Sequence, residues 1–197
     1  MLASDSPRRA TLLVEAGFEF ESVSPRVAEK FDVDLTLREL TTWNAIRKGT
    51  SVARAHPDKV VLAADTLIGL DGKIIGKPAD FNEAAKILRW LSGRTHEVCS
   101  AVFICHLKAA RSVTFREISH VRFRRLSNAK IESYLAKVDP LDKAGAYAAQ
   151  GQGVEIIATI NGSYTNVVGL PMEKTAGALA EFGIQPKDSR LTDTKRL

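Results

Sequence analysis

Two arginines, Arg8 and Arg9, follow Ser6-Pro7 near the start of the chain, and the apolar-rich run after them ends at Gly17. This order predicts a helix with Ser6 as its N-cap, Pro7 in its first position and Gly17 just past its end. Cations beside the positive end of a helix dipole are unfavourable by about 0.3–1 kcal/mol each. Free N–H groups, serine hydroxyls and forked guanidinium donors suit a phosphate chain, so these residues indicate an anion site. A solvated basic turn is the alternative.

A second candidate for chemistry is Asp65, which follows the continuous apolar run 60–64. Such a run is typical of a strand buried on both faces, and open α/β sheets bind ligands at the carboxyl ends of their strands. A carboxylate there can hold a divalent metal or take a proton from water. Residues 66–75 predict a hairpin with a type I′ turn at Asp71-Gly72, so capping of a turn is the alternative role for Asp65.

Charged residues at three further positions could share such a site. Lys77 lies between a glycine, which lets the backbone approach a ligand, and a proline, which stiffens the loop. A lysine held in this way can meet phosphate as a point charge. Lys48 lies in a predicted helix and Glu29 in a predicted loop. For all three, a solvated surface charge is the alternative.

The stretch 142–151 consists mostly of small residues, so its backbone can press against a flat ligand. Gln150 carries a donor and an acceptor on one amide, which fits the edge of a nucleobase. A packed glycine loop with a capping glutamine is the alternative. The four histidines form no metal-binding pair on a helix and there is no CxxC pattern, so no zinc site is predicted.

The elements that must position these residues alternate between helical and strand periodicity, which predicts a mixed α/β fold. The predicted helices cover 7–16 and 37–55, then run between Asp80 and Gly93, from Ser127 to Lys137 and from Pro171 to Gly183. The predicted strands cover 18–22, 60–64, 66–70, 73–75, 96–106, 112–123 and 154–160.

Composition narrows the class of protein. With 197 residues, 45% of them hydrophobic, the chain can bury the core of a single domain. It has no apolar run of about 18 residues and no visible signal peptide, so we expect no membrane partner and a cytoplasmic protein.

Charge and cysteine usage argue against two further classes, nucleic-acid-binding proteins and disulfide-bonded proteins. Part of the net charge of +5 lies in the tail, and no aromatic residues interleave with the basic patch Arg122, Arg124 and Arg125. No nucleic-acid partner is therefore predicted. Cys99 and Cys105 lie too far apart on one predicted strand for a disulfide, so we expect reduced core residues.

Six short segments carry a more specific signal. In order from Leu2 to about Gly183, the chain contains LASDSPRRATLL, AADT, GKP, LSGRTHEV, PLDKAGAYAAQG and INGSYTNVVGLP. With these segments the sequence resembles the Maf family of nucleoside triphosphate pyrophosphatases over nearly its whole length. The resemblance implies an elongated, mixed, twisted sheet flanked by helices around a central nucleotide cleft, as in the inosine-triphosphate pyrophosphatases. It implies one domain over 1–184, with two lobes around the cleft, and a polar tail over 185–197.

The resemblance also implies metal-dependent hydrolysis between the α and β phosphates of a nucleoside triphosphate, giving the monophosphate and diphosphate. Asp65 matches the catalytic aspartate that accepts a proton and takes part in binding the metal. Glu29 matches an acidic position that helps with the metal, Mg²⁺ or Mn²⁺, or with the water. The family's phosphate-binding positions correspond to Ser4, Arg8, Arg9, Lys48 and Lys77.

The chain departs from the family pattern at two places. An Asp-Glu pair is usual where this chain has Ala28-Glu29, a change that bears on metal affinity. Gly49 stands in the predicted helix beside Lys48, and glycine should loosen that helix by about 0.5–1 kcal/mol relative to alanine.

Three positions bear on the substrate. The family branch that acts on dTTP and UTP carries arginine, threonine and glutamine where this chain has Arg8, Thr66 and Gln150. The branch that acts on 7-methyl-GTP carries tryptophan, glutamine and glutamate there. A glutamine amide can pair with the imide edge of uracil or thymine, where an N–H lies between two carbonyls, whereas a glutamate only accepts.

We therefore predict a pyrophosphatase for dTTP, UTP and modified pyrimidine triphosphates. Three alternatives stay open: a 7-methyl-GTP-type pyrophosphatase, a non-catalytic cell-division regulator that senses nucleotides in the cleft, and, least supported, a nucleic-acid-binding module that uses the basic patch. A homodimer is expected, because members of the family often form one.

Overall fold

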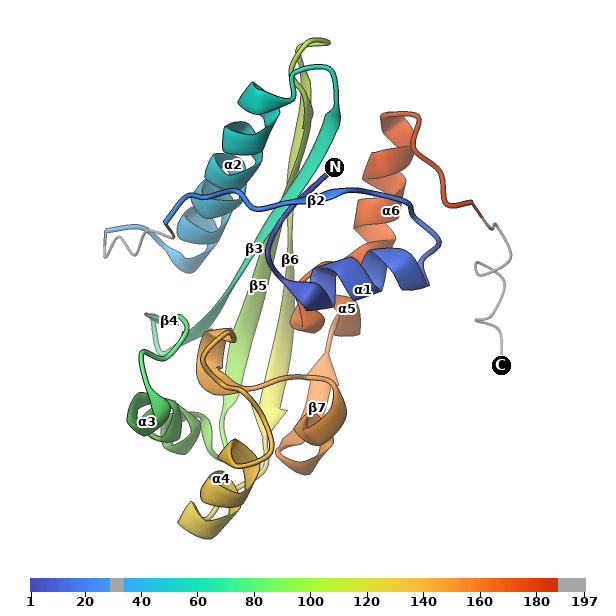
Figure 1. Ribbon diagram of the computed structural model, residues 1–197. Helices are drawn as coiled ribbons and strands as arrows, with labels where there is room; N and C mark the ends of the chain where they lie inside the picture. The colour runs from blue at the N-terminus through green and yellow to red at the C-terminus, as the bar shows by residue number, and fades with distance from the viewer. Residues whose placement is uncertain (29–33, 188–197) are drawn as a thin grey trace.

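The computed structural model describes residues 1–28 and 34–187. Its centre is a mixed sheet, the fold class that the sequence predicts (Figure 1). Within the described residues the strand order is β2-β1-β3-β5-β6-β7, with β4 paired to β3. The strands are β1 (Leu2–Ala3), β2 (Ser22–Val23), β3 (Val60–Leu70), β4 (Lys73–Ile75), β5 (Thr95–His106), β6 (Arg111–Phe123) and β7 (Ile157–Asn161).

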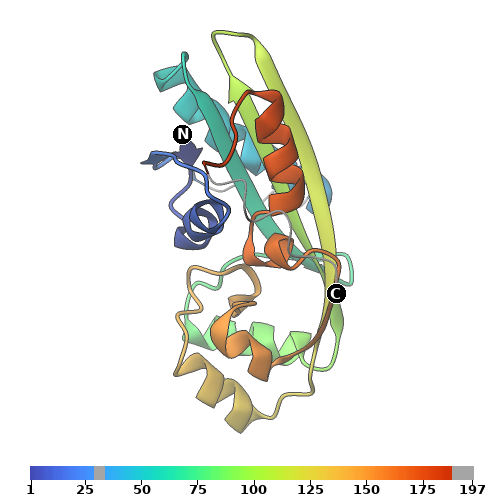
Figure 2. The same cartoon turned by 90° about the vertical axis from the view of Figure 1, so that its right-hand side faces the viewer.

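Helices cover both faces of the long strands, and the molecule is elongated along them (Figure 1, Figure 2). One face carries α2 (Leu37–Ala55), and the other carries α1 (Pro7–Glu15), α5 (Tyr164–Val168) and α6 (Met172–Glu181). At one end of the sheet lie α3 (Phe81–Leu91), α4 (Asn128–Leu135) and the 3-10 turns η1 (Ala144–Ala146) and η2 (Gly151–Glu155). No described helix is long and apolar enough to span a membrane.

The position of Asp65 differs from the prediction. The strand over 60–64 does not end before Asp65 but continues as β3 to Leu70, so Asp65 lies within a strand. The reason is pairing: β3 runs antiparallel to β5 from Val60↔His106 to Gly69↔Glu97, and the residues after Asp65 stay largely buried. Among the described strands, only β1, with its two residues, pairs with β3 in parallel.

The turn that follows β3 agrees with the prediction. Asp71 and Gly72 both have positive φ, 51° and 73°, as a type I′ turn requires. The two cysteines also agree, since Cys99 and Cys105 are free and buried in β5.

Short elements account for the other differences. The strand predicted over 18–22 is reduced to Ser22–Val23, and the one predicted over 154–160 begins at Ile157 because η2 precedes it. The sequence analysis did not foresee α5, whose five residues are too few to show a helical period.

The helix α2 matches its prediction and begins with a capping box between Thr36 and Glu39. Gly49 does not act there as a weak point. A Cβ atom at this position would lie 2.4 Å from Phe103 Cδ1 and 3.2 Å from Ala63 Cβ. Glycine therefore lets α2 lie close against β3 and β5, and this close approach brings the side chains of α2 to the middle of β3.

Candidate active site

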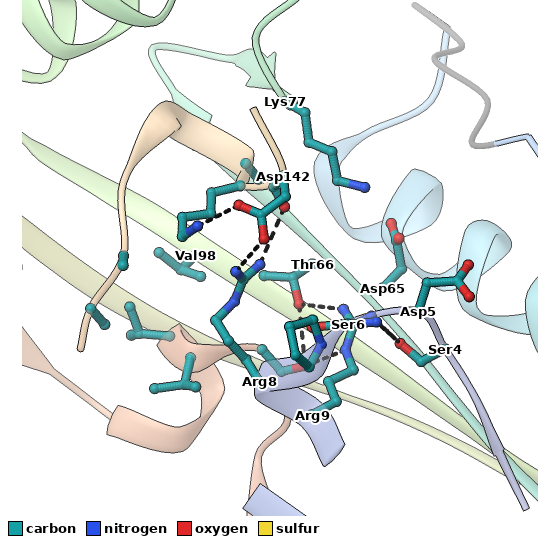
Figure 3. A pocket seen from close by; sticks show the side chains of 18 of the residues that line it. Ser4, Asp5, Ser6, Arg8, Arg9, Asp65, Thr66, Lys77, Val98 and Asp142 are labelled. Carbon is teal, nitrogen blue, oxygen red and sulfur yellow. Dashed lines mark hydrogen bonds and ion pairs between the residues drawn. The ribbon is translucent and has the colours of Figure 1, made fainter. Parts of the chain in front are cut away.

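One cavity of about 570 Å³ collects nearly all the predicted site residues. It opens between the start of α1, the middle of β3, α2, the loop around Lys77 and the segment 142–150, and Figure 3 shows part of its lining. The predicted residues that line it are Ser4, Arg8, Arg9, Lys48, Asp65, Thr66, Lys77 and Gln150. Glu29 lies outside the described residues.

Asp65 is 2% exposed, and both oxygens of its carboxylate receive hydrogen bonds from α2. Lys48 Nζ lies 2.5 Å from Oδ1, and Asn44 Nδ2 lies 3.3 Å from Oδ2. These donors are one helical turn apart and so share a face of α2. A buried charge is tolerated when it is paired and hydrogen-bonded, as this carboxylate is.

Arg9 lies on the floor of the cavity and is 8% exposed. Its Nε donates to the carbonyl of Gly169 at 2.9 Å, and its two terminal nitrogens donate to Ser4 Oγ at 3.2 Å and Thr66 Oγ1 at 3.1 Å. Thr66 in turn shares a hydrogen bond of 2.8 Å with Ser100. These contacts fix the start of α1 to β3 and to the end of α5.

The start of α1 presents an anion-compatible surface to the same cavity. Ser6 occupies the N-cap position, but its side chain makes no capping hydrogen bond, and the first turn contains no acidic residue. The main-chain N–H of Ser6 donates to Ser4 Oγ at 3.1 Å. Because Ser6, Pro7 and Arg8 all line the cavity, the positive end of the helix dipole faces into it.

Arg8 makes a contact that the sequence analysis did not foresee. Its NH1 lies 2.8 Å from Asp142 Oδ2, and its NH2 donates to the main-chain carbonyl of Asp142 at 3.2 Å. Lys143 contacts the same carboxylate. Burial raises the pKa of Asp142, but hydrogen bonds from Lys143 and Arg8 outweigh it and hold the pKa below its ordinary value.

The other half of the cavity is largely apolar. Its lining consists of Ile68, Val98, Tyr147, Ala148, Ala149, Val167 and Val168, with the half-buried Gln150 beside them. An apolar wall with one amide suits a planar heterocycle with polar edges.

Three contacts hold the segment that carries Gln150. Tyr147 Oη and His96 Nε2 lie 2.8 Å apart, and the N–H of Ala148 donates to Tyr134 Oη at 3.0 Å. The N–H of Gly145 donates to the carbonyl of Gly76 at 2.9 Å, which joins the segment to the loop of Lys77. Gly145 has φ 73°, and a Cβ atom there would lie 2.4 Å from Ile68 Cδ1, so glycine is required.

The carboxylates of the cavity bear on metal binding. Asp5 and Asp65 both line it, and both appear in Figure 3. Among the residues that the structure describes, no group of three histidine, cysteine, aspartate or glutamate side chains is placed to hold a metal ion. This donor set fits a hard cation such as Mg²⁺, which commonly takes one or two carboxylates and completes its shell with phosphate oxygens and water.

The family model of Maf-like proteins matches residues 1–182. The chain belongs to the Maf family. Relatives within it include the dTTP/UTP pyrophosphatase of Bacillus pumilus (strain SAFR-032), 41% identical over 94% of this chain and 97% of the relative. The dTTP/UTP pyrophosphatase of Symbiobacterium thermophilum is 41% identical over 93% of each chain, and that of Acinetobacter baylyi is 42% identical over 88% of this chain and 94% of the relative.

Among the residues of this Maf-family cavity or its support that were not predicted as site residues are Asp5, Asn44, Asp142 and His96. Two of them left a signal in the sequence. Asp5 stands between the two serines of the first motif, and Asn44 precedes Lys48 by one helical turn. The contact of Asp142 with Arg8 spans 134 positions, so only the fold reveals it.

Proposed function

We propose that this Maf-family protein hydrolyses dTTP and UTP, and modified pyrimidine triphosphates, to the nucleoside monophosphate and diphosphate. The observation that carries the proposal is the division of one cavity into two halves. One half holds Arg9, Lys48, Lys77 and the start of α1, and the other is apolar and holds Gln150. The activity that the relatives' names print supports the same substrates.

In the proposed reaction the triphosphate lies against the cationic half of the cavity. A water oxygen attacks the α-phosphorus while the bond from that phosphorus to the bridging oxygen breaks, and diphosphate leaves. Asp65 accepts the proton of the attacking water. Lys48 and Asn44 orient its carboxylate, since each oxygen is held by one of them. Phosphoryl transfer needs mainly such positioning and charge stabilisation.

We further propose that Mg²⁺ or Mn²⁺ is held by Asp65 and Asp5 together with the phosphate oxygens, with Glu29 as a predicted further ligand. When bound, the cation would neutralise charge that develops on the phosphates. The donor chemistry supports this, because carboxylate oxygens are the ligands that such cations prefer.

Base recognition is proposed to rest on Gln150, whose amide can both donate to a carbonyl and accept from the imide N–H of uracil or thymine. Gln150→Glu should therefore shift preference away from UTP. Thr66→Gln is a less clean change, since the Thr66 hydroxyl hydrogen-bonds Arg9 and Ser100 and its loss would disturb the floor of the cavity.

The test is turnover of a nucleotide panel with Mg²⁺ or Mn²⁺, with detection of diphosphate. We expect dTTP and UTP to be the best substrates and Asp65→Asn to lose at least about 100-fold in kcat, the scale of a general base. Because this change leaves Lys48 without its carboxylate, the variant's folding is checked by circular dichroism and by binding of a non-hydrolysable UTP analogue.

Four outcomes would contradict the proposal. Release of single phosphate would overturn the site of cleavage, and full activity of Asp65→Asn would overturn the role of that residue. Tight nucleotide binding without turnover under either metal would favour a nucleotide-sensing regulator, and preference for 7-methyl-GTP would favour the other enzyme branch.

A further inference from the structure

Arg8 links the start of α1 to a segment 134 positions further along the chain. Its guanidinium engages two different atoms of Asp142, a carboxylate oxygen at 2.8 Å and the main-chain carbonyl at 3.2 Å. The guanidinium is planar, and one of its terminal nitrogens binds the side chain of Asp142 while the other binds the backbone. The contact therefore fixes the main chain at Asp142 as well as its carboxylate. The pair lies on the lining of the cavity, as Figure 3 shows.

The α1 end of this link is anchored independently. Arg9, the next residue, is buried and hydrogen-bonds Ser4, Thr66 and the carbonyl of Gly169. The backbone that carries Arg8 is therefore held against β3 and α5 whatever Arg8 itself contacts.

The other end leads directly into the segment with Gln150. Asp142 is followed by Lys143, which contacts the same carboxylate and donates to the carbonyl of Asp139 at 2.6 Å. The carboxylate thus stands between two cations. The side chain of Asp142 is 43% exposed, and that of Arg8 is 24% exposed. A guanidinium compensated in this way contributes less to phosphate binding than an uncompensated one.

We propose that Asp142 is a positioning residue for pyrimidine selectivity: through Arg8 it sets the spacing between α1 and the segment 142–150 at which Gln150 meets the base. This inference rests on the proposed function. It gives Arg8 an indirect part in base selection, made through the opposite wall of the cavity. In the competing arrangement, Asp142 binds Arg8 only while the cavity is empty, and a bound triphosphate replaces Asp142 as the partner of Arg8.

The two arrangements differ in what Asp142→Asn does. If the pair positions Gln150, the KM for UTP rises about tenfold, the scale of one lost charge-assisted hydrogen bond, while kcat changes little. The preference for UTP over GTP falls, and inhibition by inorganic tripolyphosphate, which has no base, is unchanged. If Asp142 only competes with phosphate, the KM for UTP and the inhibition constant of tripolyphosphate both fall.

Asp139→Asn is the matched control, because it removes a carboxylate from the same loop. Asp139 caps the turn at Leu141 through Oδ1, a contact that asparagine can keep, and Arg8 is bound by Asp142. We expect this variant to keep the wild-type KM and preference. An equal rise of KM in both variants would overturn the proposal, since it would assign the effect to loop charge.

A double-mutant cycle with Arg8→Gln shows whether Asp142 acts through Arg8. We expect Asp142→Asn to have no further effect on the preference for UTP in the Arg8→Gln background. A full effect in that background would overturn the proposal and point to Lys143. Wild-type protein that does not hydrolyse UTP would overturn the proposed function instead. The spacing would then be tested by binding of a non-hydrolysable UTP analogue to the same variants, where unchanged affinity in Asp142→Asn would overturn it.

Discussion

Asp65 is almost wholly buried, yet each of its carboxylate oxygens has a donor on α2. Removing one partner of a buried ion pair costs about 3–5 kcal/mol, because the other charge is left uncompensated. The pair therefore couples chemistry to stability at one position. In the proposed function this carboxylate is the base, and Lys48 is the partner that compensates its burial.

His96 is a second buried titratable residue, on the far side of Tyr147. It is 1% exposed and packs edge-on against Phe123 and Tyr147. Burial lowers the pKa of His96 from 6.5 to about 4. The folded state therefore holds a neutral imidazole at neutral pH, and the unfolded chain takes up a proton first as the pH falls.

Stability should accordingly fall as the pH drops from 6.5 towards 4, by up to about 3 kcal/mol from this residue, and not change further below that range. His96→Gln removes the titration and keeps a group that can hydrogen-bond Tyr147. Urea unfolding of both proteins between pH 7.5 and 4.5 measures the difference, and we expect a shallower loss in the variant. Equal slopes would show that His96 titrates normally.

At the scale of single residues, the sequence predicted which side chains lie around the cavity, because short motifs carry their types and spacing. The structure brings Ser4, Arg8, Arg9, Lys48, Asp65, Thr66, Lys77 and Gln150 to one cavity. The sequence did not predict the partners that these residues contact. Asp142 and His96 acquire their contacts only when distant segments pack together, and no local pattern encodes that packing.

At the scale of elements, the approach of α2 to the sheet decides whether Lys48 and Asn44 reach Asp65. The sequence predicted the bounds of α2, since its periodicity and caps are local. It did not predict that Gly49 serves the packing, because the crowding comes from Phe103 and Ala63 on the sheet. Helix propensity alone pointed the other way.

Gly49→Ala should destabilise the protein by about 1–3 kcal/mol, the cost of overpacking a core, and should lower kcat as α2 moves away from β3. Gly177→Ala is the matched control, since Gly177 lies within α6 and a Cβ there meets nothing within 4 Å. That variant should gain about 0.5–1 kcal/mol from helix propensity. Thermal unfolding and UTP turnover of both variants measure the contrast, and a stabilised Gly49→Ala would refute the packing role.

At the scale of the whole molecule, the mixed sheet could be predicted, but the order of its strands and the length of β3 could not. Long antiparallel pairing with β5 extends β3 through Asp65, and pairing between distant strands leaves no mark in either segment. The predicted domain end at 184 stays a prediction. Contacts continue to Lys187, whose N–H donates to the carbonyl of Gly17 at 2.9 Å.

The cavity is lined by segments spread from Ser4 to Gly169 along the chain, so a ligand that fills it should stabilise the entire fold. At a concentration about 100 times its Kd, a non-hydrolysable UTP analogue should add about 2.7 kcal/mol. That corresponds to a rise in Tm of roughly 5–10 °C for a chain of this size. Tripolyphosphate at the same concentration should give a smaller rise because it leaves the apolar half unfilled, and an equal rise would argue against base binding there.

The hydrogen bond from the N–H of Gly145 to the carbonyl of Gly76 has a geometric consequence. It joins the backbone beside Lys77 to the backbone that leads to Gln150. The loop of the lysine and the segment of the glutamine are therefore held together directly. In the proposed function, this link restricts the distance between the backbone that carries the phosphate-binding lysine and the backbone that carries the base-binding amide. It therefore favours ligands whose charged end and heterocycle are separated by a similar length.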